Sequence, residues 1–282
     1  MASSLFSRRS FLALSATLPW ALRAGALSSI PVGLEIYSVR EAMARDPFGT
    51  VRAVAEMGYE CVEFYAPYFE WTEIQTQQMR KLMDDLGIRC FSTHNDAPFL
   101  TPEKLNRTRD RNLILGSMNV VQASSEETKT LDGWRIIAER LNLAADKLEP
   151  DGLRVGYHNH QPEFTALQGQ RPMEILAKHT KRSITLQLDI GTCLEAGSDP
   201  VAWIRSNPGR IRSMHCKDWS PQAGKGYSVL LGEGIADWKK IFEAAESVGG
   251  IEYYLVEQEG SRLSELDTAK ACLKTFREKH LS

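Results

Sequence analysis

Short apolar runs alternate with longer amphipathic stretches along the chain from Pro31 onward. The runs have the length and composition of buried strands, whereas the stretches place apolar residues at the spacing of one helix face. Three of the stretches stop at Gly58, Gly87 and Gly116, and glycine commonly follows the last turn of a helix. This alternation of strands and helices predicts a parallel sheet covered by helices.

The alternation divides into eight strand–helix units. The expected strands are residues 32–37, 61–65, 88–93, 119–123, 153–158, 184–189, 211–215 and 253–257. The expected helices are residues 40–57, 72–86, 102–115, 131–148, 172–179, 200–206, 235–248 and 263–279. Eight units in a chain of this length favour a closed barrel, so the predicted fold class is α/β, a single (β/α)8 TIM barrel over residues 28–282. The first strand is not followed by a glycine-rich dinucleotide turn, which argues against an open doubly wound sheet.

Residues 1–27 are expected to form a separate segment. Arg8 and Arg9 precede an apolar stretch that runs to Leu22, and the small residues 24–26 follow it. This pattern resembles a twin-arginine signal, which carries folded proteins across a bacterial inner membrane. The apolar stretch is too short for a comfortable membrane span. We therefore expect export to the periplasm without a stable span, while a mitochondrial-type presequence or an uncleaved anchor stays open.

The composition is that of an ordinary globular protein. The chain has 282 residues, of which 43% are hydrophobic and 25% are charged, and one barrel would use nearly all of it. The formal net charge of −2 gives no reason to expect binding to nucleic acid or to acidic membranes. The five cysteines are odd in number and lack the close spacing of a metal motif. We expect free core cysteines, because Cys61, Cys90 and Cys216 lie in apolar strand-like runs.

Four predicted strands end on a residue type that binds metals. These residues are His158, Asp189, His215 and Glu257. In a closed parallel barrel the strand ends meet at one mouth, where these side chains would surround one cation. Imidazoles and carboxylates are rarely buried without partners, which favours one shared site over four separate roles. Mixed nitrogen and oxygen ligands suit one divalent Mn, Zn, Co or Fe ion, and the sequence does not choose among these metals.

Further polar residues near the same strand ends are candidates for catalysis. His160 shares a strand face with His158, so it either replaces His158 as a ligand or hydrogen-bonds the substrate. Glu257 and Glu163 are the candidates for proton transfer, which needs a group of suitable pKa within reach of the substrate carbon. Lys217 lies two positions after the seventh-strand ligand, and we expect it either to stabilise negative charge on an enolate or to form a salt bridge.

Two residues of earlier strands are candidates for contact with the substrate. His94 follows the third strand, and Glu63 lies in the second strand, where it either pairs with a basic group or binds a hydroxyl. A loop with two glycines, residues 232–234, precedes a helix near the mouth, and it either closes over the substrate or simply leads into the helix. An ion bound at this mouth would polarise a substrate oxygen and stabilise an enediolate.

The strand-end motifs resemble those of the xylose-isomerase-like barrel superfamily of sugar phosphate isomerases and epimerases. The resemblance covers about residues 31–280 and is carried by 33–40 (GLEIYSVR), 62–64 (VEF), 156–160 (GYHNH), 188–189 (LD), 214–218 (MHCKD), 232–234 (GEG) and 256–257 (VE). In the ketose epimerases of this group, glutamate, aspartate, histidine and glutamate from the last four strands hold a divalent metal. Asp189, His215 and Glu257 match the last three, whereas His158 stands in place of the first glutamate.

The resemblance implies two functions that share the first half of a mechanism. The first is a divalent-metal-dependent isomerase or epimerase of a sugar or keto-sugar, which works through an enediolate. The second is a dehydratase or lyase of a keto-sugar or inosose, because a His-x-His strand end is similar to the inosose dehydratase branch. Remote alternatives are a non-catalytic sugar-binding barrel and an abasic-site endonuclease. We expect a small-molecule sugar or polyol as the partner and no nucleic acid, and the sequence leaves a homo-oligomer open.

Overall fold

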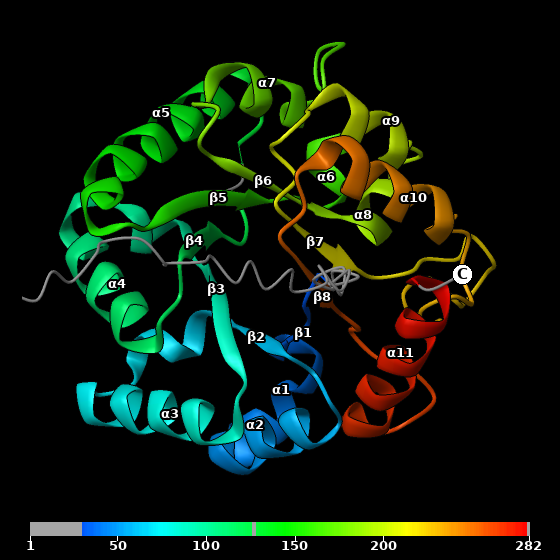
Figure 1. Ribbon diagram of the computed structural model, residues 1–282. Helices are drawn as coiled ribbons and strands as arrows, with labels where there is room; N and C mark the ends of the chain where they lie inside the picture. The colour runs from blue at the N-terminus through cyan, green and yellow to red at the C-terminus, as the bar shows by residue number, and fades with distance from the viewer. Residues whose placement is uncertain (1–29, 126–127, 281–282) are drawn as a thin grey trace, which may run out of the picture.

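The computed structural model describes residues 30–125 and 128–280. The predicted export signal, residues 1–27, lies outside the described residues. Within them, eight parallel strands close into one barrel, in which each strand pairs with the next and β8 pairs with β1 (Figure 1). Closure pairs both sides of every strand, so the sheet has no free edge in this part of the chain. The predicted (β/α)8 barrel is therefore confirmed.

The strands lie close to the predicted runs. They are β1 (Val32–Glu35), β2 (Cys61–Phe64), β3 (Arg89–Asn95), β4 (Asn119–Gln122), β5 (Arg154–His158), β6 (Thr185–Asp189), β7 (Ser213–Cys216) and β8 (Tyr253–Val256). β3 runs beyond its predicted end and includes His94. The register pairs Glu35 with Glu63 and Asp189 with His215, so these residues lie beside one another on adjacent strands.

Helices surround the barrel as an outer ring (Figure 1). The α-helices are α1 (Arg40–Arg45), α2 (Pro47–Glu56), α3 (Glu73–Leu86), α4 (Pro102–Leu115), α5 (Leu131–Leu148), α6 (Gln161–Phe164), α7 (Pro172–His179), α8 (Ile190–Glu195), α9 (Pro200–Ser206), α10 (Trp238–Ala244) and α11 (Glu265–His280). Short 3-10 turns are η1 (Ile36–Val39), η2 (Ala66–Glu70), η3 (Ala97–Leu100) and η4 (Glu149–Asp151), and η5 (Ala245–Gly249) is a π turn that continues α10.

The helix predicted over residues 40–57 is divided in two. Asp46 adopts an extended conformation between α1 and α2, and its side chain accepts a hydrogen bond of 2.9 Å from the Gly49 amide. Pro47 begins α2, because a proline tolerates the first helical turn, where its missing amide hydrogen would have no partner. The short helices α6 and α8, which follow β5 and β6, were not predicted.

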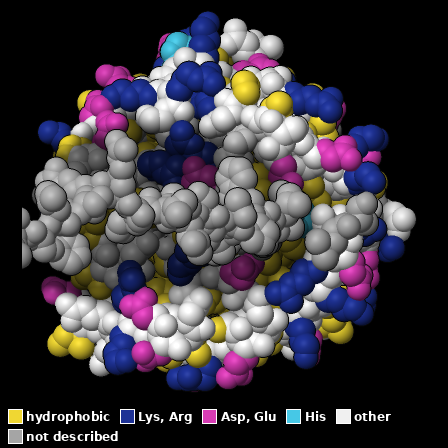
Figure 2. Space-filling model, in the orientation of Figure 1, with side chains coloured by type: hydrophobic (Ala, Val, Ile, Leu, Met, Phe, Trp, Pro, Cys, Tyr) yellow, Lys and Arg dark blue, Asp and Glu magenta, His cyan; other side chains and the backbone are white. Residues whose placement is uncertain are grey.

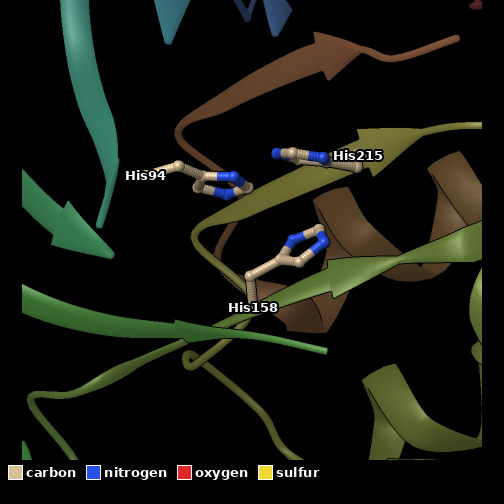
Figure 3. Close-up of side chains that lie close together, drawn as sticks. All are labelled: His94, His158 and His215. Carbon is tan, nitrogen blue, oxygen red and sulfur yellow. The ribbon is translucent and has the colours of Figure 1, made fainter. Parts of the chain in front are cut away.

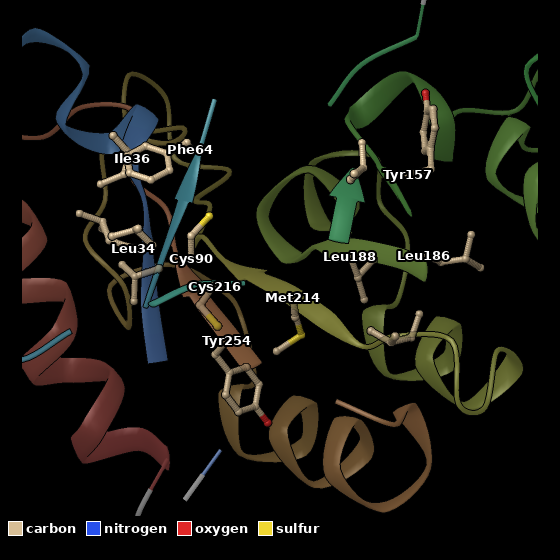
Figure 4. Packing of buried hydrophobic residues seen from close by; sticks show 14 of the residues in the cluster. Leu34, Ile36, Phe64, Cys90, Tyr157, Leu186, Leu188, Met214, Cys216 and Tyr254 are labelled. Carbon is tan, nitrogen blue, oxygen red and sulfur yellow. The ribbon is translucent and has the colours of Figure 1, made fainter. Parts of the chain in front are cut away.

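Side chains alternate along each strand between the barrel interior and the helix layer. On the outer side, Leu34, Leu186, Leu188 and Met214 are fully buried in the large apolar cluster that joins strands to helices (Figure 4). The alternate positions of these strands carry buried polar residues: Glu35, Gln187, Asp189, Ser213 and His215. The barrel interior is therefore polar over part of its length.

The other part of the barrel interior is apolar. Cys61, Tyr253 and Leu255 form a separate buried cluster, against which Phe91 packs. A Cβ atom at Gly33 would come within 2.4 Å of Cys61 Sγ, so only glycine leaves room for this contact. Cys61 and Tyr253 begin their strands, so this cluster lies at the amino-terminal end of the barrel. The polar residues occupy the carboxyl-terminal end, which is the mouth.

The cysteines and the surface agree with a globular barrel. All five cysteines are buried and free. No helix within residues 30–125 and 128–280 has both the length and the apolar character needed to cross a membrane. On the face shown in Figure 2, Lys and Arg side chains are interspersed with Asp and Glu side chains, as the formal net charge of −2 leads one to expect.

Candidate metal centre

Four strand ends bring imidazole and carboxylate groups to one place at the mouth. His158 and Asp189 are the last residues of β5 and β6, His215 lies in β7, and Glu257 directly follows β8. One ligand atom of each residue lies within 4.8 Å of those of the other three. All four side chains are buried, and Glu257 is the most exposed at 7%. The structure therefore brings together the four residues that the sequence suggests as ligands.

His94, on β3, adds a third imidazole to this region (Figure 3). Its ring is stacked 4.9 Å from the His215 ring and lies 4.6 Å from the His158 ring, measured between centroids. Ring nitrogens of the three histidines lie within 4.8 Å of one another, so they form a second set of possible ligands. His94 is buried and bonds to protein groups, whereas the sequence suggests a substrate contact.

Glu63, on β2, lies inside the barrel next to these imidazoles and is fully buried. His215 Nε2 donates to Glu63 Oε1 at 2.7 Å, and His215 Nδ1 donates to Glu257 Oε2 at 2.9 Å. Burial alone would raise the pKa of Glu63, but the charge of His94 and the hydrogen bond from His215 lower it to about 2. Burial disfavours a charged imidazole, but Glu257 and Glu63 raise the pKa of His215 to about 10. Glu63 thus faces histidines rather than the open mouth.

Gln187, on β6, is a buried polar residue of the site that was not predicted. Its Oε1 accepts hydrogen bonds from His94 Nε2 at 2.6 Å and from His158 Nδ1 at 3.0 Å. Its Nε2 donates to Glu63 Oε2 and to Ser213 Oγ, each at 3.0 Å. The two-residue alternation of a strand would have found it, because it precedes the strand-end aspartate by two positions on the same face.

The two carboxylate oxygens of Asp189 differ in their surroundings. Oδ1 accepts a hydrogen bond of 2.8 Å from the Thr192 amide in α8. Oδ2 is buried and forms an ion pair with Lys217 Nζ at 2.8 Å, and His158 Nε2 lies 3.8 Å from it. Burial raises the pKa of Asp189, an effect that Lys217 opposes. A buried carboxylate oxygen that already faces a cationic group and a histidine nitrogen fits a cation site.

Lys217 lies buried among three carboxylates. Its Nζ is 2.8 Å from Asp189 Oδ2, 3.2 Å from Glu257 Oε2 and 2.6 Å from Glu259 Oε1. Burial opposes its charge, but these carboxylates raise the pKa of Lys217 well above its usual range. Burial would raise the pKa of Glu257, but Lys217 and His215 hold it well below its usual range. Lys217 forms a salt bridge, and its place beside two candidate ligands also suits charge stabilisation.

His160 and Glu163 belong to the turn that follows β5. The His160 ring is partly exposed and lies 5.0 Å from the His158 ring, so it borders the mouth. Glu163 is buried, and it accepts hydrogen bonds from Tyr157 Oη at 2.7 Å and from the His160 amide at 2.9 Å. These bonds cap α6, and among the described residues Glu163 does not join the ligand groups around Glu257. The structure thus supports a capping role for Glu163.

Glu35, on β1, extends the polar network further into the barrel and was not predicted as part of it. Together with Glu63, His94 and His215 it forms a deeper group whose candidate ligand atoms lie within 4.8 Å of one another. Burial and the charge of Glu63 raise the pKa of Glu35 well above its usual range. Its Oε2 has no hydrogen-bond partner among the described residues. Burial and the neighbouring carboxylate of Glu63 thus both oppose ionisation of Glu35.

The loop between β7 and α10 is fastened to Asp218, which is fully buried. Asp218 Oδ2 accepts from the Gly232 amide at 2.8 Å and from Trp238 Nε1 at 3.0 Å. Oδ1 accepts from the amides of Trp219 at 2.9 Å and Ala236 at 3.3 Å. Of the two alternatives for residues 232–234, these four bonds favour a fixed connection to the helix.

The candidate ligands fit a divalent ion. The group combines two imidazoles, His158 and His215, with two carboxylates, Asp189 and Glu257. This mixture of nitrogen and oxygen ligands suits Zn, Mn, Fe or Co, and all four side chains are buried. Oδ2 of Asp189 faces Lys217 Nζ at 2.8 Å and His158 Nε2 at 3.8 Å, so positive charge is already accommodated beside it.

The chain is similar to a known family over most of its length. The family model described as xylose isomerase-like TIM barrel matches residues 51–279. The chain is 24% identical over 187 residues to the inosose dehydratase of Geobacillus thermodenitrificans, an alignment that covers 60% of this chain and 62% of that protein. It is 28% identical to the inosose dehydratase of Lacticaseibacillus casei over 50% of each chain. It is 22% identical to the L-ribulose-5-phosphate 3-epimerase of Shigella flexneri, over 72% of this chain and 77% of that one.

Solved structures share the fold at low identity. A sugar phosphate isomerase/epimerase from Parabacteroides distasonis superposes with a TM-score of 0.75 at 22% identity, and the match covers 90% of this chain and 96% of that one. The IolI protein, whose crystal structure holds a zinc atom, superposes with a TM-score of 0.69 at 16% identity, over 89% of this chain and 98% of that one. The chain spans only 62% and 50% of the two inosose dehydratases named above.

Proposed function

We propose a function from the premise that this chain belongs to the xylose isomerase-like TIM barrel family. In this proposal the protein is a divalent-metal-dependent isomerase or epimerase, and it converts a sugar or keto-sugar through an enediolate. Sequence relatives named as inosose dehydratases and as an L-ribulose-5-phosphate 3-epimerase support a sugar-processing enzyme. The observation that carries the proposal is the cluster of four buried strand-end residues, whose candidate ligand atoms lie within 4.8 Å of one another.

In this proposal the residues at the mouth have two roles, which are binding of the ion and transfer of a proton. His158, Asp189, His215 and Glu257 would hold the ion, which when bound polarises a substrate carbonyl and stabilises the enediolate. Glu257 is kept ionised by its neighbours, so its carboxylate can accept a proton from the carbon next to that carbonyl. Lys217 lies 3.2 Å from Glu257 Oε2, where its ammonium group orients the carboxylate and balances negative charge.

The partly exposed His160 is the residue best placed to contact the substrate. Its ring borders the His158 ring at 5.0 Å, whereas His94 and Glu63 are buried and bonded to protein groups. An imidazole at the rim can donate a hydrogen bond to a sugar hydroxyl or accept one from it. We therefore assign substrate binding to His160 and support of the ligand histidines to Glu63.

A dehydratase or lyase of a keto-sugar or inosose is the second candidate. His158 stands where the ketose epimerases of this superfamily are expected to carry a metal-bound glutamate, so Glu257 lacks a carboxylate counterpart on the opposite face of the substrate. One carboxylate suffices to remove a proton from the carbon. A neighbouring hydroxyl can then take up that proton and leave as water, instead of the proton returning to carbon. The inosose dehydratases among the sequence relatives also support this reaction.

A solvent-exchange assay distinguishes the two reactions. The protein loaded with Mn or Zn is offered keto-sugars and inososes in heavy water. Deuterium at the carbon of an isomerised or epimerised product supports the first candidate, whereas net loss of water or of an aglycone supports the second. Metal analysis accompanies the assay, and a wild-type protein that takes up no metal when metal is supplied contradicts both.

The variant Glu257→Gln tests the proton-transfer role. Loss of a positioned acid–base group costs about 100-fold to 10,000-fold in turnover, and we expect a loss in that range with the sugar still bound. Glu259→Gln is the matched control, because Glu259 also contacts Lys217 but is partly exposed at the rim. Both variants are compared by steady-state turnover and by calorimetric binding of the sugar. Equal losses in the two variants would contradict the role of Glu257.

We also propose that the protein works in the periplasm after export. Arg8 and Arg9, followed by the apolar stretch that ends at Leu22, support a twin-arginine signal. That route carries folded proteins, and the five buried, free cysteines are compatible with folding in a reducing cytoplasm before transport.

A further inference from the structure

We infer that Gln187 is a positioning residue that determines which nitrogen of His158 faces the candidate metal position. The inference rests on the proposed function, because it concerns the same site. It assigns His158 Nε2 as the coordinating atom, with Nδ1 tied to Gln187 by a hydrogen bond of 3.0 Å. An acceptor that binds the non-coordinating nitrogen of a ligand histidine fixes the tautomer and the orientation of the imidazole ring.

The orientation of the Gln187 amide follows from its contact with Glu63. Gln187 Nε2 lies 3.0 Å from Glu63 Oε2, and an ionised carboxylate can only accept hydrogen bonds. The amide nitrogen must therefore face Glu63, and the amide oxygen must face the imidazoles. The reversed amide would place two acceptors against each other in a region where both residues are fully buried.

The amide oxygen in turn fixes the hydrogen on His158. Because Oε1 of Gln187 only accepts, His158 Nδ1 must carry the hydrogen of the 3.0 Å bond between them. A metal ligand is a neutral imidazole, so the lone pair then lies on His158 Nε2. That atom is 3.8 Å from Oδ2 of Asp189, a carboxylate oxygen of another candidate ligand. The lone pair therefore points at the candidate metal position.

Glu63 and Gln187 also bind the imidazoles of His215 and His94. Glu63 Oε1 accepts from His215 Nε2 at 2.7 Å, which leaves His215 Nδ1 on the side of Glu257. His94 Nε2 lies 2.6 Å from Gln187 Oε1 and 3.0 Å from Glu63 Oε1, so this nitrogen is directed away from an ion. The hydrogen bond between Gln187 and Glu63 thus links the two residues that support the imidazoles. This arrangement favours a metal site formed with Asp189 and Glu257 over one formed by the three histidines.

The tautomer of His158 can be measured in protein freed of metal. Two-bond proton–nitrogen correlation spectra of protein labelled with 15N-histidine report which ring nitrogen carries hydrogen, and the His158→Gln variant assigns the signal. We expect hydrogen on Nδ1 in the wild type. Gln187→Met removes the acceptor at similar side-chain length, so we expect a mixture of both tautomers in that variant.

Metal affinity supplies the second readout, by calorimetric titration with Zn or Mn. Loss of a supporting partner typically lowers metal affinity about 10-fold to 100-fold, and we expect such a fall for Gln187→Met. The matched control is Gln122→Met, because Gln122, the last residue of β4, is also a fully buried glutamine. Its amide donates to the Ser124 carbonyl in the following loop and does not bond to an imidazole. The control should leave both the tautomer and the affinity at wild-type values. Gln187→Glu places a carboxyl group beside Glu63, where it is expected to be protonated and to donate its hydrogen to Glu63 Oε2 as the amide nitrogen does. Its other oxygen then still accepts from His158, so hydrogen should stay on Nδ1.

Three results would overturn the inference: hydrogen on Nε2 of wild-type His158, an unchanged tautomer and affinity in Gln187→Met, or loss of the Nδ1 hydrogen in Gln187→Glu. Should Gln187→Met fail to fold, the wild-type spectrum and the spectrum of Gln187→Glu still test the inference. A wild type that shows the expected tautomer but binds no metal would contradict the proposed function while leaving the role of Gln187 in the ring orientation intact.

Discussion

His215 must lose a proton before it can bind a metal through Nδ1. Its folded pKa is raised from 6.5 to about 10, so it stabilises the fold fully below pH 6.5 and loses this contribution as the pH rises through 10. Between these values metal and proton compete for the same nitrogen. We expect one proton to be released per metal near pH 7.5, and the apparent affinity to rise about tenfold per pH unit. Calorimetry in two buffers of different ionisation enthalpy measures this release, and equal heats in both would contradict it.

Lys217 neutralises buried carboxylates that would otherwise repel one another. Removing one partner of a buried ion pair costs about 3–5 kcal/mol, so we expect Lys217→Met to lower the free energy of unfolding by that amount. A divalent ion should restore more stability to this variant than to the wild type, since it replaces the missing charge. Urea unfolding with and without Mn or Zn measures both effects.

The control for this variant is Lys240→Met, because Lys240 forms an exposed ion pair with Asp237. Solvent screens an exposed pair, so we expect a loss much smaller than that of Lys217→Met. A Lys217→Met variant as stable as the control would show that the buried carboxylates do not depend on the lysine.

The candidate ligands could be predicted from the sequence because each stands at the end of a strand. The roles of Glu63 and Glu163 could not, because they depend on groups brought near by folding. Glu63 lies against His94 and His215 across the barrel, and Glu163 accepts a hydrogen bond from Tyr157 Oη. Residue type alone does not tell a supporting carboxylate from a catalytic one.

At the level of elements, Asp218 fastens the loop between β7 and α10 by four hydrogen bonds. Asp218→Ala leaves buried donors without an acceptor, which costs about 1–3 kcal/mol for each group that water cannot reach. We expect the free energy of unfolding to fall by about 3 kcal/mol, measured by urea titration.

The neighbouring Asp237 offers a matched control, because it caps α10 through an exposed hydrogen bond to the Lys240 amide. Loss of an N-cap side chain typically costs about 1 kcal/mol, and we expect Asp237→Ala to lose no more. Similar losses in the two variants would mean that the buried carboxylate of Asp218 contributes no more than an ordinary cap.

The existence of the main strands and helices followed from periodicity, whereas their subdivision did not. Asp46 and Pro47 end one helix and begin another within a stretch that keeps a single apolar periodicity. α6 and α8 are too short to show a helical period, and each follows a strand directly. Capping bonds decide such details, and these bonds depend on three-dimensional geometry.

For the whole molecule, the count of eight strand–helix units was enough to predict closure. The register was not predictable, because nothing in the sequence states that Glu35 lies beside Glu63 or that Asp189 lies beside His215. Register sets the depth of each side chain in the barrel. It therefore separates the ligands at the mouth from the carboxylates beneath them.

Export is also a property of the whole molecule, and the paired arginines provide its test. Replacing Arg8 and Arg9 together by lysine keeps the charge but removes the pattern of the signal. We expect the wild type in the periplasmic fraction of bacterial cells and the double variant in the cytoplasmic fraction, as measured by immunoblotting. A hydrophobic substitution outside the signal, Ile136→Leu on α5, serves as the control for expression. An unchanged distribution of the double variant would argue against the twin-arginine route.

The buried thiols have a practical consequence for handling the protein. Burial raises the pKa of Cys61 and Cys216 well above the usual thiol value, so the reactive thiolate is scarce at neutral pH. All five sulfur atoms are shielded from solvent, and none is joined to another. We therefore expect the thiols of the native protein to react slowly with oxygen, peroxide and disulfide reagents. Purification and storage can therefore dispense with dithiothreitol.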